Sequence, residues 1–261
     1  MSATGTMPTA TLRGGLKLPL VGFGTWPMTG QQAHRAVSEA LEAGYRLIDT
    51  ATMYRNEREV GRAIADSGLR RDQLVITTKL PQERAGRERQ TIEASLEALG
   101  VDQVDLWLIH WPPGGDARPD SWAELLRARS DGLAHTVGVS NYSPSQLDEL
   151  HRASGEMPPI DQIPWGPSRF DAQLMSALAE RNVVLESYSP LKNTNLRDPV
   201  LNEIAGRHGV TAAQVVVRWH LEHGFVAIPK SSTRPRIAEN LDVLGFSLDP
   251  QELQRLDALG R

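Results

Sequence analysis

The stretch GYRLIDTATMYRNEREVG runs from Gly44 to Gly61 and decides how the rest of the chain is interpreted. A short apolar run ends on the carboxylate of Asp49, and Tyr54 follows five residues later, before a helical pattern begins. A buried strand that ends on a polar group, then a loop and a helix, is typical of a βα unit with its chemistry at the carboxyl end of the strand. We therefore expect Asp49 and Tyr54 to lie on the same edge of a parallel sheet.

This unit recurs along the whole chain. Near-continuous apolar runs of a few residues, typical of parallel strands buried on both faces, alternate with stretches of helical periodicity. The strands expected from these runs are 20–24, 46–49, 74–79, 104–110, 134–139, 160–163, 183–188 and 225–228. The expected helices are 31–43, 57–66, 87–99, 120–128, 144–152, 172–181, 199–207, 212–222, 234–241 and 251–259. Ser143 is the predicted N-cap of the helix that starts at Pro144.

Eight βα units in 261 residues predict one α/β domain over residues 1–261, a (β/α)8 TIM barrel. Residues 9–19, with Gly14-Gly15 at their centre, predict an N-terminal β-hairpin, and the last helices are additions to the barrel. The alternative is a doubly wound sheet. The pattern Gly22-Phe-Gly24 lacks the third glycine of a dinucleotide fingerprint and has no helix directly after it, which favours the barrel.

Composition narrows the class of protein. The net charge of −4 argues against nucleic acid as a partner, because nucleic-acid binding usually requires a basic face. The chain has no cysteine, which excludes disulfides and thiolate metal sites. No apolar run approaches the ~18 residues of a membrane span, and the polar opening MSATGTMPTATLRGG does not resemble a signal peptide. We expect a cytoplasmic protein without a membrane partner.

Chemistry-bearing side chains end three consecutive strands. Asp49, Lys79 and His110 follow one another at intervals of 30 and 31 residues, one βα unit each. The carboxyl ends of barrel strands face a common mouth, so these three side chains and Tyr54 are expected to converge. Each one alone is more often a structural hydrogen-bonding group. Four at the ends of consecutive units indicate a site.

The four groups suit the donation of a proton to an oxygen that becomes an alkoxide. A tyrosine hydroxyl has a reference pKa of about 10, and a nearby ammonium lowers that pKa by stabilising the phenolate. Lys79 is the expected ammonium, and Asp49 holds it charged and oriented. His110 is expected to hydrogen-bond a substrate carbonyl oxygen. Carbonyl reduction also needs a hydride donor, which no side chain supplies, so a nicotinamide cofactor is required.

Five motifs in order resemble the aldo-keto reductase superfamily, and among its members the bacterial 2,5-diketo-D-gluconate reductase type. The motifs lie at 49–61 (DTAxxYxNExxxG), 95–112 (SLxxLGxDxVDLxLIHWP), 138–141 (GVSN), 188–191 (YSPL) and 228–240 (IPKSxTxxRIxEN). The resemblance implies a (β/α)8 barrel and an NADPH-dependent reductase that converts aldehydes or ketones to alcohols by hydride transfer from nicotinamide C4. It implies a catalytic tetrad of Tyr54 as general acid with Lys79, Asp49 and His110. The implied partner is a small carbonyl substrate, and we expect a monomer.

The resemblance also implies where the cofactor binds. Ser140, Asn141 and Gln162 would hold the nicotinamide, and Tyr188 would stack on its ring. The full set of expected cofactor-binding residues is Thr25, Trp26, Asp49, Ser140, Asn141, Gln162, Tyr188, Ser189, Pro190, Leu191, Lys230, Ser231, Ser232, Thr233, Arg236, Glu239 and Asn240.

Charged residues expected at the other end of the cofactor also indicate NADPH. Lys230, Ser231, Thr233 and Arg236 follow the last strand, where many barrels bind phosphate. An ammonium, a guanidinium and two hydroxyls suit a dianionic monoester such as an adenosine 2′-phosphate, which favours NADPH over NADH.

The substrate side is less constrained by the sequence. The expected substrate residues are Trp26, Met53, Tyr54, His110 and Trp111. The loops that follow Trp111 and Leu191 are short, and long loops carry specificity on such scaffolds, so we expect an open pocket with broad substrate tolerance. After the sixth strand, Pro164 and Gly166 replace the Glu and His that are usual in the superfamily, which predicts a different local loop.

Two other functions compete with reduction. A barrel of this superfamily can be a regulatory or structural subunit, although the complete tetrad weighs against that role. A lyase or isomerase would use Lys79 as a Schiff-base nucleophile, but pairing with Asp49 would keep Lys79 charged.

A metal site is not expected. His220 and His223 are three residues apart on an expected helix, yet no third ligand has suitable spacing. We expect this pair to lie on a solvated helix face.

Overall fold

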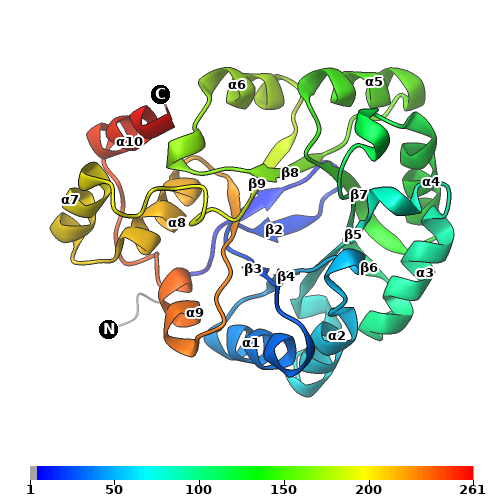
Figure 1. The fold of residues 1–261 in the computed structure, drawn as a ribbon, viewed down its shortest axis with the longest axis horizontal. Coiled ribbons are helices and arrows are strands. Elements are labelled where there is room, and N and C mark those ends of the chain that lie inside the picture. Colours follow the sequence, from blue (N-terminus) through cyan, green and yellow to red (C-terminus); the bar gives the residue numbers. More distant parts are fainter. Residues whose placement is uncertain (1–4, 261) are drawn as a thin grey trace.

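The computed structural model describes residues 5–260, and within that range the central feature is an eight-stranded parallel sheet that curls into a barrel (Figure 1). The strands follow chain order from β3 to β10. The first and last strands meet, because Val21 pairs with Ala227 and the backbone N–H of Gly22 donates to Ala227 O at 2.8 Å. The predicted (β/α)8 barrel is confirmed.

The sheet consists of β3 (Phe23–Gly24), β4 (Leu47–Asp49), β5 (Val75–Leu80), β6 (Val104–Ile109), β7 (Ala134–Ser140), β8 (Ile160–Pro164), β9 (Val184–Tyr188) and β10 (Val226–Ile228). The helices around it are α1 (Gly30–Ala43), α2 (Glu57–Asp66), α3 (Glu88–Leu99), α4 (Pro119–Ser130), α5 (Pro144–Ser154), α6 (Ala172–Glu180), α7 (Pro199–His208), α8 (Ala212–Glu222), α9 (Arg234–Leu241) and α10 (Pro250–Asp257). Figure 1 shows these helices as a ring around the strands.

Most predicted bounds agree with the structure to within two residues, but the first strand does not. The predicted strand 20–24 is reduced to Phe23–Gly24, because pairing with β4 begins only at Phe23. Residues 20–22 instead bond to Ala227 of the last strand, and Leu20 N also donates to Pro8 O at 2.9 Å. This segment nevertheless packs closely against the Leu47 side chain of β4. A Cβ atom at Gly22 would lie 2.6 Å from the side chain of Leu47.

The predicted N-cap at Ser143 is confirmed. The Ser143 side chain accepts a hydrogen bond from Gln146 N, and the Gln146 side-chain oxygen accepts one from Ser143 N, which makes a capping box at the start of α5. Gly44 and Gly100 end α1 and α3 in the left-handed conformation that favours glycine, with φ of 111° and 69°.

The predicted N-terminal hairpin is also confirmed, as β1 (Thr9–Thr11) paired antiparallel with β2 (Lys17–Pro19). Leu12 and Leu18 are buried. The Arg13 guanidinium donates to the carbonyls of Met157 and Arg181, which precede β8 and β9. The hairpin therefore covers the amino-terminal end of the barrel and leaves the opposite end for the site.

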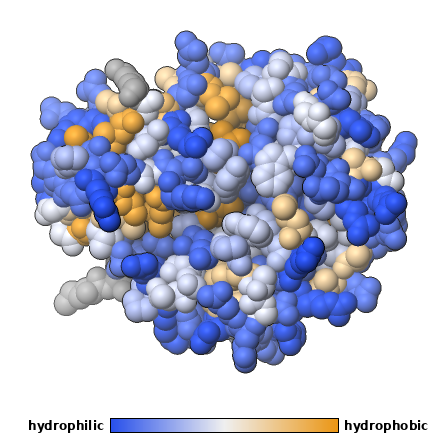
Figure 2. All heavy atoms as spheres, in the orientation of Figure 1, coloured by the Kyte–Doolittle hydropathy of each residue, from blue (hydrophilic) through white to orange (hydrophobic). Residues whose placement is uncertain are grey.

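No helix among residues 5–260 has the length and apolar character needed to cross a bilayer. Figure 2 shows that one face of the molecule is mainly hydrophilic, with apolar side chains gathered where α7 and α8 lie in Figure 1.

Two helical glycines give a matched test of the packing. A Cβ atom at Gly61 of α2 would lie 2.2 Å from Leu99 O at the end of α3, whereas a Cβ atom at Gly206 of α7 would meet nothing within 4 Å. We expect Gly61→Ala to lower the free energy of unfolding by about 1–3 kcal/mol through overpacking. Gly206→Ala should raise it by roughly 0.5–1 kcal/mol because alanine favours the helix. Urea denaturation measures both, and equal effects at the two positions would contradict the role of Gly61.

Candidate active site

The expected tetrad converges at the carboxyl end of the barrel. Asp49, Lys79 and His110 stand at or directly after the ends of β4, β5 and β6, and Tyr54 lies in the short 3-10 turn Thr52–Tyr54 that follows β4. The Lys79 Nζ atom is 5.2 Å from the centroid of the Tyr54 ring, and the rings of Tyr54 and His110 meet edge to face at 5.6 Å.

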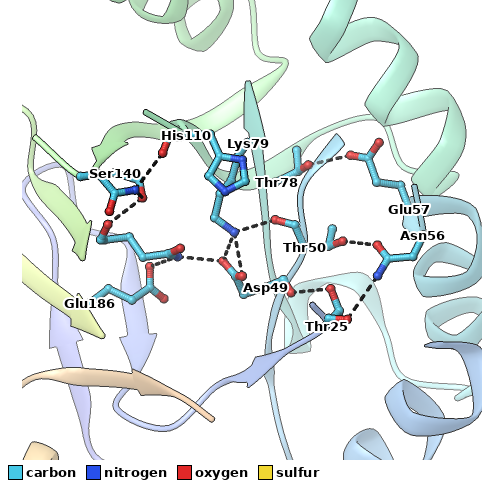
Figure 3. A network of polar contacts seen from close by, with 12 residues as sticks. Thr25, Asp49, Thr50, Asn56, Glu57, Thr78, Lys79, His110, Ser140 and Glu186 are labelled. Carbon is cyan, nitrogen blue, oxygen red and sulfur yellow. Dashed lines mark hydrogen bonds and ion pairs between the residues drawn. The ribbon is translucent and has the colours of Figure 1, made fainter. Parts of the chain in front are cut away.

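An ion pair between Lys79 and Asp49 forms the base of the site (Figure 3). Both side chains are buried, and Lys79 Nζ donates to both carboxylate oxygens of Asp49 at 2.7 Å and to the carbonyl of Thr50 at 2.8 Å. Burial lowers the pKa of Lys79 and is the largest single effect, but the charge and hydrogen bonds of Asp49, with smaller contributions from Tyr54 and Glu186, together outweigh it and leave that pKa raised. Lys79 is therefore an ammonium whose three N–H groups are all used.

The hydroxyl of Tyr54 has a raised pKa, which corrects the expectation drawn from the sequence. Burial raises the pKa and is the largest effect, Lys79 lowers it, and Asp49 raises it. The sequence indicated the ammonium but not the burial around it. Tyr54 is consequently protonated at neutral pH, as a proton donor must be, and Lys79 offsets part of the cost of forming the phenolate.

His110 is a neutral imidazole in this setting. Burial lowers its pKa to about 2, with the Lys79 charge contributing. Its ring stacks on that of Trp111 at 4.0 Å, and its buried Nδ1 has no hydrogen-bond partner in the part of the chain that the structure describes. A neutral imidazole can donate one hydrogen bond without adding a second positive charge beside Lys79.

Hydrogen bonds behind the tetrad attach the start of α2 to the strands (Figure 3). The Thr50 hydroxyl donates to Asn56 Oδ1 at 2.6 Å, and Asn56 Nδ2 donates to Met28 O at 2.8 Å. On the next strand, the Thr78 hydroxyl donates to the buried Glu57 carboxylate at 2.6 Å. The turn that carries Tyr54 is thus fixed between β4 and α2.

A cleft of about 570 Å³ opens above the tetrad. The expected site residues that line it are Thr25, Trp26, Asp49, Met53, Tyr54, His110, Trp111, Gln162, Tyr188, Ser189, Pro190, Leu191 and Lys230. The expected residues outside its lining are Lys79, Ser140, Asn141, Ser231, Ser232, Thr233, Arg236, Glu239 and Asn240. Trp26 and Met53 are 53% and 41% exposed, so the apolar rim of the cleft is open to solvent.

The residues expected at the nicotinamide are joined to one another. The Tyr188 hydroxyl donates to Asn141 Oδ1 at 3.0 Å, and Asn141 Nδ2 donates to Ser140 Oγ at 2.9 Å and to His110 O at 3.0 Å. Asn141 is left-handed, with φ of 65°, a conformation that asparagine tolerates well. Gln162 Nε2 donates to Asp49 Oδ2 at 2.8 Å. These side chains are oriented before any ligand binds.

At the expected phosphate end, two cations are unpaired. Lys230 follows β10 and Arg236 lies in the first turn of α9; both are exposed, and neither forms an ion pair with any of residues 5–260. The neighbouring Arg234 differs, since its guanidinium pairs with Glu42 of α1 at 3.0 Å. Glu239 Oε1 accepts a hydrogen bond from the Thr211 hydroxyl at 2.7 Å, so it is tied to α8.

The departure at Gly166 has a steric explanation. A Cβ atom there would lie 2.7 Å from Thr194 Oγ1 and 3.0 Å from Pro190 O. The glycine therefore lets the loop after β9 pack closely against the loop after β8. The loop after β9 includes Ser189, which is left-handed with φ of 52°, and Leu191. Both residues line the cleft.

The expectation of a solvated histidine pair is wrong for His220. That side chain is buried, and its Nδ1 is 2.8 Å from Val216 O. The apolar face of α8 packs against the barrel, and His220 lies on that face rather than outside it. His223 is partly buried and contacts Asp257 at 2.9 Å. No group of three or more potential metal ligands occurs among the described residues 5–260.

Sequence reasoning missed Glu186, a fully buried residue of β9. Its Oε2 accepts a hydrogen bond from Gln162 Nε2 at 2.9 Å, so it is joined to the tetrad. Period-two alternation from Tyr188 places Glu186 on the same, inward side of the strand. A charged residue at an inward strand position was the available signal. Lys192, Gly24 and Pro229 were also missed and line the cleft.

The comparisons with known proteins agree with this geometry. A sequence profile of the Aldo/keto reductase family matches residues 20–261. An aldo-keto reductase of Mycolicibacterium smegmatis is 45% identical over 258 residues, covering 97% of this chain and 91% of its own. A crystal structure of an aldo/keto reductase from Brucella melitensis has a TM-score of 0.94 and 38% identity, covering 97% of this chain and 100% of that one.

A further solved structure holds the cofactor. The Bombyx mori aldo-keto reductase, in complex with NADP, has a TM-score of 0.90 and 30% identity, covering 98% of this chain and 94% of that one. Sequence, fold and extent of coverage all lead to one assignment. The chain belongs to the aldo/keto reductase family of oxidoreductases.

Proposed function

We propose that this protein is an NADPH-dependent reductase that converts aldehydes or ketones to alcohols. The observation that carries the proposal is the buried Lys79–Asp49 pair, which lies beneath the Tyr54 ring at the base of the cleft. A fixed ammonium beside a protonated phenol is the arrangement that stabilises a phenolate as a proton leaves. In a cleft of this family, that proton goes to a carbonyl oxygen.

In the proposed reaction, the bound nicotinamide supplies a hydride from C4 to the carbonyl carbon of the substrate. The Tyr54 hydroxyl gives its proton to the carbonyl oxygen, which completes the alcohol and leaves a phenolate. Lys79 stabilises that phenolate, and Asp49 keeps Lys79 charged. His110, whose lowered pKa keeps it neutral near pH 7, donates a hydrogen bond to the carbonyl oxygen and orients it. A proton from solvent restores Tyr54.

The residues around the cleft suit NADPH. Tyr188 lines the cleft, where its ring would stack on the nicotinamide, and its hydroxyl donates to Asn141. Lys230 and Arg236 offer unpaired positive charge at the far end, where the 2′-phosphate of the adenosine would lie. Ser231, Thr233 and the backbone N–H groups of Arg234 and Arg236 at the start of α9 add hydrogen-bond donors, whereas Pro235 has none.

The same geometry disfavours Schiff-base chemistry. A lysine nucleophile must lose its proton and reach the substrate, whereas Lys79 is buried with three hydrogen bonds to Asp49 and Thr50.

Replacing Tyr54 tests the assigned acid. Tyr54→Phe removes the hydroxyl and keeps the ring, so kcat for carbonyl reduction should fall by about 10²–10⁴-fold. The affinity for NADPH, measured by quenching of protein fluorescence, should stay within about threefold because the ring still packs against Trp26. Retention of more than a tenth of the wild-type kcat would contradict the assignment.

Arg236 and Arg234 make a matched pair for cofactor choice. Arg236→Ala should raise the Kd for NADPH about 10–100-fold, the value of one charge-assisted hydrogen-bonded contact, with little effect on NADH. Arg234→Ala should change neither Kd much, since that side chain is engaged with Glu42. Equal losses for both nucleotides in Arg236→Ala would show that Arg236 does not bind the 2′-phosphate.

The open rim of the cleft predicts broad substrate use. Trp26, Met53 and Trp111 offer apolar and aromatic surface with little enclosure. Uncharged aliphatic and aromatic carbonyls should therefore be reduced with kcat/KM values within about a hundredfold, the range that modest apolar contacts allow. NADPH oxidation across a panel of aldehydes, ketones, keto acids and sugars measures this range. Strong selectivity for one small aldehyde would contradict an open pocket.

A further inference from the structure

A second carboxyl group lies inside the barrel next to the proposed proton-donating site. Glu186 of β9 and Asp49 of β4 are both buried, and Gln162 of β8 lies between them. Gln162 Nε2 donates one hydrogen bond to Asp49 Oδ2 at 2.8 Å and another to Glu186 Oε2 at 2.9 Å. Figure 3 shows Glu186 and Asp49 joined through this amide nitrogen.

The charges in this part of the barrel do not balance if every group is ionised. Asp49 and Glu186 would carry two negative charges, and Lys79 carries one positive charge. An uncompensated charge in a buried site is costly, and the group concerned takes up a proton instead. One of the two carboxyl groups must therefore keep a proton.

Geometry assigns that proton to Glu186. Asp49 contacts the Lys79 ammonium with both of its oxygens, whereas Glu186 forms no ion pair with any of residues 5–260. The Oε1 atom of Glu186 is buried without a partner in the same range, and the residue paired with it on β10 is the apolar Val226. Burial, followed by repulsion from Asp49, raises the pKa of Glu186 to about 8.

The two carboxyl groups also fix the direction of the Gln162 amide. Both of its N–H groups are taken by acceptors inside the barrel, so the nitrogen cannot turn toward the cleft without losing them. The carbonyl oxygen of the amide is the end left for a ligand in the cleft, which Gln162 lines.

We propose that Glu186 is a positioning residue of the reductase site. Its neutral carboxyl group orients Gln162 and does not compete with Asp49 and Tyr54 for the positive charge of Lys79. Ionisation of Glu186 weakens reduction. This inference rests on the proposed function. The groups that act on Glu186 are Asp49 on β4 and Lys79 on β5, with the neutral Gln162 on β8.

The direction of the pH effect follows from the charges. When Glu186 ionises, a second negative charge competes for Lys79 and disfavours the phenolate of Tyr54. A unit charge several ångströms away, at an effective dielectric of about 20, changes an equilibrium about tenfold or more. The kcat of the wild type for carbonyl reduction should therefore fall about tenfold as the pH rises through about 8.

The variant Glu186→Gln keeps an oxygen that accepts from Gln162 but cannot ionise. Its kcat at pH 7 should lie within about threefold of the wild type, and the fall near pH 8 should disappear. Asp161→Asn is the matched control. Asp161 is on β8, is equally buried and has its pKa raised to about 8, but its Oδ1 accepts from Tyr142 N instead of contacting Gln162 or Asp49. The control should keep the alkaline fall, and a fall with the same midpoint in Glu186→Gln would overturn the proposal.

A second measurement needs neither cofactor nor turnover. Because the pKa of Glu186 is raised on folding, the folded state holds a proton that the unfolded state releases, and stability is lost as the pH rises from about 4.5 to about 8. The melting temperature of Glu186→Gln minus that of the wild type should therefore increase across this window. A difference in melting temperature that stays constant across this window would show that Glu186 ionises in the folded protein as it does in the unfolded chain, and would overturn the proposal.

The wild type alone supplies a third check in case the variant fails to fold. The side-chain carboxyl ¹³C spectrum of the glutamate-labelled protein, without cofactor, should contain a resonance that titrates near pH 8. Absence of any glutamate resonance that titrates above pH 7 would overturn the proposal. Absence of NADPH-dependent turnover by the wild type on the carbonyl panel would contradict the proposed function. Both cofactor-free measurements would still decide whether Glu186 is protonated.

Discussion

The ion pair between Lys79 and Asp49 is the interaction on which the site depends. A buried ammonium is tolerated only with a carboxylate and full hydrogen bonding, and the barrel supplies both from adjacent strands. Register makes this possible, because parallel pairing sets Asp49 beside Thr77 on β5, two residues before Lys79. The proton chemistry above therefore follows from how β4 and β5 align, and every other group is arranged around that alignment.

Two kinds of support surround this pair. The groups proposed to handle the proton stand on strand ends or on a turn braced by Asn56 and Glu57, so they are held rigidly. The cofactor wall uses loops, and the close contact at Gly166 keeps one of them in place. The substrate rim has neither support, with Trp26 largely exposed. The proposed catalytic groups are thus held by the sheet, whereas the residues proposed to contact the substrate lie on the exposed rim of the cleft.

Much of this arrangement could be predicted from sequence. The eight strands and the convergence of the tetrad follow from apolar runs that end on polar residues at one-unit intervals, and those signals are local. The misjudged features depend on tertiary contacts. The first strand is shortened by one-sided pairing, His220 is buried by the packing of α8, and Tyr54 has a raised pKa because the folded site excludes water. Glu186 was not predicted because a single inward carboxylate indicates a site only once its contact with Gln162 is known.

The hairpin at the amino-terminal end has a consequence for exchange with solvent. Leu12 and Leu18 are buried at that end, whereas Asp49 and Gln162 line the cleft at the opposite end, from which water can approach them. A cofactor laid across the cleft would occupy the same route. A bound cofactor would then lie between solvent and the buried side chains at the base of the cleft.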